Sequence, residues 1–133
     1  MDGSTSLAIT AIYGGLLGLL FLALTAGVIL RRGQTGTGMG DGGDRLLARR
    51  VRAHGNFAEF APLGLVLMLL TELMGAPREA LHLAGGLLLV GRAMHGLALS
   101  RETPSVFLRS GGMVLTILSV GSTSVALIAH SLW

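Results

Sequence analysis

A regularly spaced set of polar side chains enters a long apolar stretch near the middle of the chain. The set steps by 4, 3, 4 and 3 residues and consists of Arg45, Arg49, Arg52, Asn56 and Glu59. In an α-helix that spacing places all five side chains on one face. Arginine can clamp a carboxylate with two parallel hydrogen bonds, asparagine both donates and accepts, and glutamate can hold an ammonium group. The face therefore suits a zwitterionic ligand with several carboxylates.

The same polar face also has a structural interpretation. An ionisable group at the centre of a membrane helix costs about 2.5–3.5 kcal/mol on insertion scales, so Glu59 is expected to find a partner. Asn56 and Arg52 precede it on the same face, and Arg92 or His95 could approach from another helix. The sequence alone leaves two interpretations open, a polar network that locks helices together and a ligand pocket that opens to the cytoplasm.

The composition is typical of a membrane protein. Of the 133 residues, 51% are hydrophobic and only 13% are charged, whereas charged residues make up about 25% of a typical soluble protein. The absence of cysteine excludes a disulfide framework and a thiolate metal site, so any thiol must come with a ligand. All basic residues are arginines beside apolar runs, which argues against nucleic-acid binding. A lone Glu79-x-x-His82 pair does not make a metal site.

The apolar residues form four runs, which predict an all-α integral membrane four-helix bundle protomer. We expect one domain over residues 1–133, with helices at about 7–30, 45–73, 80–99 and 106–130. Arg31-Arg32 follows the first run, so that run is expected to be an uncleaved helix. Residues 33–44 are rich in glycine but lack the Lys-Ser/Thr of a phosphate loop, so they are expected to form a flexible connection. Asp44 is expected to be the N-cap of the second helix.

The arginines between the runs predict the orientation in the membrane. Six of them separate the first two runs: Arg31, Arg32, Arg45, Arg49, Arg50 and Arg52. The second connection has only Arg78, offset by Glu72 and Glu79, whereas Arg101 and Arg109 flank the third connection. By the positive-inside rule the first and third connections face the cytoplasm. We therefore expect a multi-pass membrane protein with both termini outside the cytoplasm.

The polar face lies within a segment that resembles a family signature. Arg49-x-x-Arg52-Ala53-His54-x-Asn56-x-x-Glu59-x-x-Pro62 is similar to the signature of the MAPEG proteins, the membrane-associated proteins in eicosanoid and glutathione metabolism. Arg31-Arg32 resembles basic residues that the family carries at the end of its first helix. The resemblance covers the layout of the whole chain and is sharp in residues 49–62. The short chain looks most like the bacterial YecN-like branch, and this resemblance implies a location in a bacterial inner membrane.

The resemblance implies a homotrimer in which glutathione, as co-substrate, lies between neighbouring subunits near the cytoplasmic end of the second helix. The implied activity is that of a glutathione transferase or peroxidase acting on lipophilic electrophiles that arrive from the membrane lipid. The glutathione-binding residues that it implies are Arg52, Asn56 and Glu59 in contact with the tripeptide, Arg31 and Arg49 at the mouth of the pocket, and His54 near it.

Catalysis is less well supported by the resemblance than binding. Arg101 resembles an arginine that stabilises the glutathione thiolate, since a nearby cation lowers the pKa of a thiol. The alternative interpretation is that Arg101 is an ordinary charged residue of a cytoplasmic loop. Phe60 stands where the leukotriene-synthesising branch has a tyrosine, and Tyr13 is the only tyrosine in the chain. Arg92 and His95 could provide substitute polar contacts.

Two other functions remain possible from the sequence. A small multi-pass transporter could use Glu59 for proton-coupled exchange. Compact four-helix exporters, however, carry that acid in the first helix, and here the first apolar run has no charge. A non-catalytic structural membrane trimer is the third interpretation.

Overall fold

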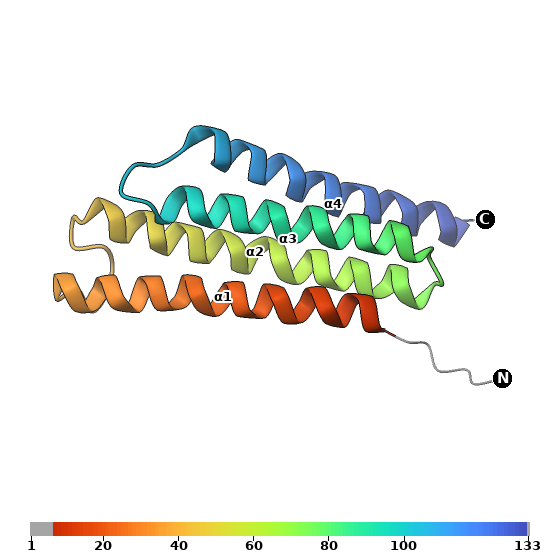
Figure 1. Ribbon diagram of the computed structural model, residues 1–133, viewed down its shortest axis with the longest axis horizontal. Helices are drawn as coiled ribbons and strands as arrows, with labels where there is room; N and C mark the ends of the chain where they lie inside the picture. The colour runs from red at the N-terminus through yellow and green to blue at the C-terminus, as the bar shows by residue number, and fades with distance from the viewer. Residues whose placement is uncertain (1–6, 133) are drawn as a thin grey trace.

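The structure is an antiparallel arrangement of four long helices. It is a computed structural model that describes residues 7–132. The helices are α1 (Ala8–Thr35), α2 (Arg45–Leu73), α3 (Arg78–Ser100) and α4 (Val106–Leu132), and this described part contains no strand. Figure 1 shows that α1 begins and α4 ends at the same end of the bundle. The all-α prediction is confirmed. Residues 1–6 and Trp133, which the sequence places in the same domain, lie outside the described residues.

Each helix is long and apolar enough to cross a membrane. The four helices contain 28, 29, 23 and 27 residues, and each includes an apolar window of membrane-spanning length. Large apolar side chains cover much of the outer surface, including Leu19, Leu22 and Ile29 on α1 and Phe107 and Val125 on α4. A surface of that kind is stable in lipid and would aggregate in water. The prediction of four membrane helices is therefore confirmed.

α1 is longer than its apolar run. It continues past Leu30 and ends at Thr35, where Gly36 adopts the left-handed conformation (φ 66°) and donates its N–H to the carbonyl of Arg32. Glycine ends a helix in this way at little steric cost. Arg31 and Arg32 therefore lie on the last turns of the helix rather than in the connection.

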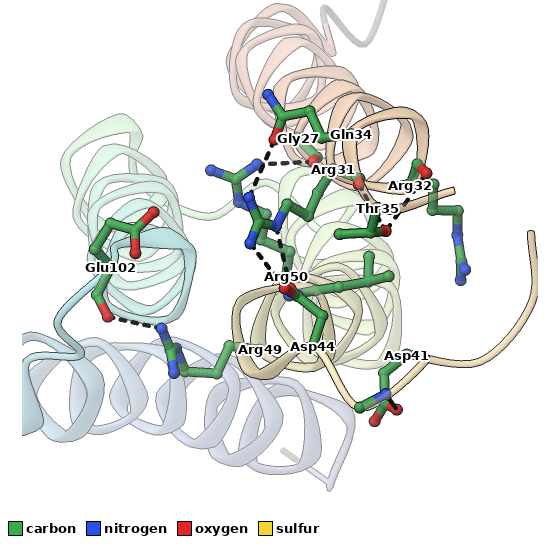
Figure 2. A network of polar contacts seen from close by, with 12 residues as sticks. Gly27, Arg31, Arg32, Gln34, Thr35, Asp41, Asp44, Arg49, Arg50 and Glu102 are labelled. Atoms are coloured by element: carbon green, nitrogen blue, oxygen red, sulfur yellow. Dashed lines mark hydrogen bonds and ion pairs between the residues drawn. The ribbon is translucent and has the colours of Figure 1, made fainter. Parts of the chain in front are cut away.

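The connection from α1 to α2 is held by two arginines and one carboxylate, and Figure 2 shows the pair of Arg31 and Asp44. Asp44 accepts from the Leu47 N–H at 2.6 Å, which confirms it as the N-cap of α2, and it pairs with Arg31 at 2.7 and 3.1 Å. The Arg31 guanidinium and the Leu47 N–H hold the pKa of the Asp44 carboxyl below its usual value. Arg32 donates to the Gly40 carbonyl at 2.8 Å. These bonds fix the glycine-rich segment against the helix ends.

A second carboxylate fixes α1 at the opposite end of the bundle. Glu72, near the end of α2, accepts from the backbone N–H groups of Ile9 and Thr10 at 3.1 and 2.8 Å. These are among the first N–H groups of α1, which have no partner within the helix, and a negative charge there also complements the helix dipole. α1 is thus attached to α2 near both of its ends.

α3 and α4 approach each other backbone to backbone. A Cβ atom added to Gly112 would lie 2.6 Å from the Gly91 carbonyl oxygen, and one added to Gly91 would lie 2.8 Å from that of Gly112. Ser119 extends the contact by donating to the Ala84 carbonyl at 2.8 Å. Small residues at helix contacts are the usual basis of close packing in membranes. The contact sets the depth of the space that α3 and α4 leave beside α2.

We predict that Gly112→Ala destabilises the protein by about 1–3 kcal/mol, because the new methyl group overpacks a backbone contact. Thermal unfolding in detergent measures the change. Gly121→Ala is the matched control, since nothing lies within 4 Å of a Cβ at Gly121 on the same helix. At that position, replacing a helical glycine by alanine should leave the free energy of unfolding unchanged or raise it by up to about 1 kcal/mol. Equal destabilisation by both substitutions would contradict the close contact.

Candidate functional site

A polar cavity opens between α2, α3, α4 and the connection between α3 and α4. Its volume is about 540 Å³. The lining residues are Ala48, Arg49, Arg52, Asn56, His95, Leu99, Pro104, Arg109 and Met113. It lies in the half of the bundle that holds the cluster of arginines. The cavity is large enough for a small-molecule ligand, and its lining brings together four of the residues singled out from the sequence, namely Arg49, Arg52, Asn56 and His95.

The polar face of α2 forms one wall of this cavity. Arg49, Arg52 and Asn56 line it together, as expected for side chains three and four residues apart. Glu59 lies one turn further along and pairs with Arg52 at 3.3 Å. The two side chains are 63% and 55% exposed, so this ion pair contributes little to stability. Each of the two groups can therefore give up this ion pair for a contact with a ligand at a small cost in free energy.

Arg49 connects the cavity wall to the connection between α3 and α4. Its Nη2 donates to the carbonyl oxygens of Arg101 and Glu102 at 3.1 and 2.8 Å, and the contact with Glu102 is visible in Figure 2. Its Nε is buried and has no hydrogen-bond partner within residues 7–132. The guanidinium thus holds the connection in place, while its Nε stays a buried donor without a partner among the described residues.

The two cations at the ends of α3 and α4 are placed differently. Arg101 contributes its backbone carbonyl to Arg49, and its exposed side chain is not part of the cavity lining. Arg109, on the first turn of α4, does line the cavity. The sequence identified Arg109 only as a loop charge. Arg109 shares one face of α4 with Met113, which also lines the cavity, but nothing in the sequence indicated that this face meets α2.

The deepest part of the site is a hydrogen-bonded pair of buried side chains from two helices. Arg92 on α3 is 1% exposed, Asn56 on α2 is 6% exposed, and Arg92 Nη1 donates to Asn56 Oδ1. An arginine can only donate, so the amide of Asn56 must turn its oxygen to Arg92. The NH₂ group of Asn56 is then the part of the amide left for the cavity. Asn56 acts there as a donor.

Arg92 has three further neighbours and no acid. Its Nε donates to Thr116 Oγ1 at 2.9 Å, its Nη2 lies 3.1 Å from Met113 Sδ, and its guanidinium stands 5.2 Å from the centre of the Phe60 ring. Among the described residues no carboxylate lies within ion-pair distance of it. The charge is stabilised by dipoles, sulfur and the aromatic ring, and an anion in the adjacent cavity would add to that stabilisation.

His95 lies one turn after Arg92 on α3. It is 5% exposed and lines the cavity. The sequence proposed Arg92 and His95 together as polar contacts for the α2 face, without assigning a role to either. His95 lies in the wall of the cavity, whereas Arg92 is buried behind that wall. Polar residues three apart in an apolar run were the signal that both share one helix face.

Arg31, near the end of α1, and His54, on α2, both lie away from this cavity. Arg31 is bound to Asp44 and also donates to Gln34 at 3.2 Å. The His54 ring stacks on Phe21 with ring centres 4.6 Å apart, and its Nε2 lies 3.1 Å from Thr25 Oγ1. Neither side chain lines the cavity.

The cavity offers hydrogen-bond donors almost exclusively. Three guanidinium groups and the Asn56 NH₂ belong to the lining, which contains no acid, and the Glu59 carboxylate pairs with Arg52 beside it. Such a lining suits an anion with at least two carboxylate-like groups and has no obvious place for a free cation except beside Glu59. Within the described part of the chain, no three His, Cys, Asp or Glu residues are grouped to hold a metal ion.

Comparisons with known proteins agree with this architecture. The sequence pattern of the MAPEG family matches residues 10–129. Two curated relatives, both named Inner membrane protein YecN, come from Escherichia coli strain K12 and from Escherichia coli O6:H1 strain CFT073. Each is 39% identical over 87 residues, which is 65% of this chain and 66% of the relative. The match thus spans just under two thirds of these relatives. No solved structure matches the chain.

A double-mutant cycle tests the buried pair behind the cavity. We predict that Arg92→Met and Asn56→Ala each destabilise the protein, with a coupling energy of about 1.5–3 kcal/mol, because a hydrogen bond to a charged group is lost only once. Unfolding in detergent measures all four forms. Ser122→Ala on α4, which removes a hydroxyl bonded only within its own helix, is the control. Additive effects of the two substitutions would show that the pair does not interact.

Proposed function

Because this chain belongs to the MAPEG family of membrane proteins, we propose that it binds glutathione in the cavity between α2, α3 and α4. The observation that carries the proposal is the convergence of Arg49, Arg52 and the Asn56 NH₂ on one cavity. These residues belong to the segment that resembles the family signature. The fold and the membrane location follow from the family and from the four apolar helices. The ligand and the activity are the proposal.

The charges of glutathione complement those of the cavity. The tripeptide has two carboxylates, one ammonium group and a thiol. Its carboxylates fit the donors of Arg49, Arg52 and Arg109. Its ammonium group fits Glu59, which is exposed and, among the described residues, pairs with Arg52 alone. The amide of Asn56 would donate to a carboxylate or peptide carbonyl deeper in the cavity. Since this chain has no cysteine, the ligand would provide the only thiol of the site.

The positions of Arg31 and His54 support a site shared between subunits. Both residues belong to the predicted glutathione-binding set, yet both lie away from the cavity of their own protomer. In a homotrimer they would reach the cavity of the neighbouring subunit, with Arg31 at its mouth. The homotrimer is part of the proposal.

The proposed chemistry is attack by the glutathione thiolate on a lipophilic electrophile. The sulfur forms a bond to the electrophilic carbon or oxygen, and the leaving group departs with the bonding electrons and takes up a proton. Glutathione would enter from the cytoplasm and the electrophile from the bilayer. Arg101 is the proposed thiolate-stabilising cation, and Arg109 is a second candidate because it lines the cavity. A cation close to the sulfur would lower the pKa of the thiol and increase the reactive fraction.

Two other candidate functions would give different experimental results. A transporter that used Glu59 would show substrate-driven proton flux in proteoliposomes, abolished by Glu59→Gln. A non-catalytic trimer would bind glutathione without conjugating or reducing any of a panel of electrophiles and hydroperoxides. The pairing of Glu59 with Arg52, a residue of the cavity lining, favours ligand binding over proton exchange, because it places the carboxylate beside the other proposed ligand contacts.

Calorimetry with detergent-purified protein tests glutathione binding directly. We expect binding by the natural protein and a Kd weakened about tenfold or more by Arg52→Ala, since a hydrogen bond to a charged group contributes about 1.5–3 kcal/mol. Glu59→Gln should weaken binding in the same direction. Arg45→Ala, an exposed position on the same helix and outside the cavity, should change it little. No heat with the natural protein would remove the proposal, and unchanged heat with both site variants would place the ligand elsewhere.

Thiolate absorbance tests the activation of the bound thiol. Titration of the complex should give a thiol pKa below that of free glutathione. We predict that Arg101→Gln raises this pKa by about one unit, which corresponds to about 1.4 kcal/mol of lost thiolate stabilisation. Arg109→Gln, measured in parallel, shows whether the cation within the cavity lining contributes more. An unshifted thiol in the natural protein would favour the non-catalytic trimer.

A further inference from the structure

A second cavity lies on another side of the bundle, between α1 and α3. Its volume is about 530 Å³, and its lining is apolar except at one end. The lining residues are Leu20, Ala23, Leu24, Ala26, Gly27, Leu30, Arg50, Ala93, Gly96, Leu97 and Ser100. It shares no residue with the arginine-lined cavity. We call it the α1–α3 groove.

The groove has a direction along the membrane normal. Leu20 and Ala93 mark its deep end, and Leu30 and Ser100 mark the end nearest the arginine-rich connections. From residue 20 to residue 30 a helix rises about 15 Å, which is half of the ~30 Å hydrocarbon core. The groove therefore has the length of one leaflet. By the distribution of arginines this is the cytoplasmic leaflet.

The polar end of the groove holds one cation without an acid. Arg50 extends from α2 between the two groove helices, where its Cδ lies beside Gly27 and its Nη1 donates to the Gly27 carbonyl at 3.1 Å (Figure 2). No carboxylate of the described residues pairs with it, whereas the nearby Arg31 is neutralised by Asp44. Its other guanidinium donors, together with the Ser100 hydroxyl, are available to an anion.

We propose that the α1–α3 groove binds an anionic phospholipid of the cytoplasmic leaflet. One acyl chain lies along the apolar wall, and the headgroup phosphate accepts hydrogen bonds from Arg50 and Ser100. Basic pockets between membrane helices on the cytoplasmic side have this chemistry. The length of the groove fits the acyl chain of a lipid whose headgroup lies at the membrane surface. A free phosphate would make no use of that apolar length.

A helix from a second copy of the chain is the competing occupant. The small residues Ala23, Ala26 and Gly96 would allow close helix contact. Such a helix would, however, cover Arg50 and leave its charge against apolar residues, at a high cost in free energy. A lipid phosphate removes that cost. The charge of Arg50 therefore favours lipid over protein.

Native mass spectrometry of the purified full-length protein tests the proposal. The protein is supplied with phosphatidylglycerol and phosphatidylcholine of identical acyl chains, and the bound ratio is measured. We expect a preference for phosphatidylglycerol that falls about fivefold in Arg50→Gln, the effect of one arginine near an anionic headgroup. Arg45→Gln removes the same charge from an exposed position of the same helix and should keep the preference within about twofold.

Ala26→Phe fills the groove from an exposed position and should reduce the binding of both lipids. No preference in the natural protein, or an equal loss in Arg50→Gln and Arg45→Gln, would overturn the proposal. It would also be overturned if Ala26→Phe dissociated copies of the chain without changing the amount of bound lipid, because the groove would then be a contact between copies. None of these results depends on glutathione binding.

Discussion

The hydrogen bond between Arg92 and Asn56 is the interaction on which the rest of the site depends. An arginine within a membrane helix is costly, by about 2.5–3.5 kcal/mol even on insertion scales. Here the guanidinium is surrounded by groups from α2 and α4 that accept from it or stack on it, namely Asn56, Phe60, Met113 and Thr116. The same contacts fix the rotation of α2 relative to α3. They therefore decide which face of α2 meets the cavity.

Three arginines within four residues of α2 have three separate environments. Arg49 holds the connection between α3 and α4, Arg50 reaches into the α1–α3 groove, and Arg52 pairs with Glu59. Successive side chains of a helix differ in direction by about 100°, so neighbouring residues serve different surfaces. A charge cluster that looks uniform in the sequence is thus divided between the arginine-lined cavity and the α1–α3 groove.

The sequence predicted those features that depend on a single helix. The apolar runs gave the four spans, the 4-3-4-3 spacing gave the shared face of Arg49, Arg52 and Asn56, and the residue type of Asp44 gave the cap. The sequence did not predict features that depend on how two helices are rotated against each other. The inclusion of Arg109 in the cavity belongs to this second group, because no periodicity within one helix determines which neighbour it meets.

The burial of Arg92 was only partly predictable. A charge inside an apolar run indicated that it must have a polar partner, and Asn56 was among the few available on the neighbouring run. The neutral nature of all its partners could not be foreseen, since a carboxylate such as Glu59 was an equally good candidate. Close packing of Gly91 against Gly112 brings α4 near enough for Thr116 and Met113 to take part.

The two carboxylates that hold α1 have a mechanical consequence. Asp44 binds Arg31 at one end of the helix, and Glu72 binds the first N–H groups at the other. A rod attached to its neighbour at both ends can bow or twist, but it cannot slide along it. Any movement of α1 that admits a molecule from the bilayer must therefore be sideways. The first half of the helix, where nothing lies within 4 Å of a Cβ added at Gly15 or Gly18, has room to yield in this way.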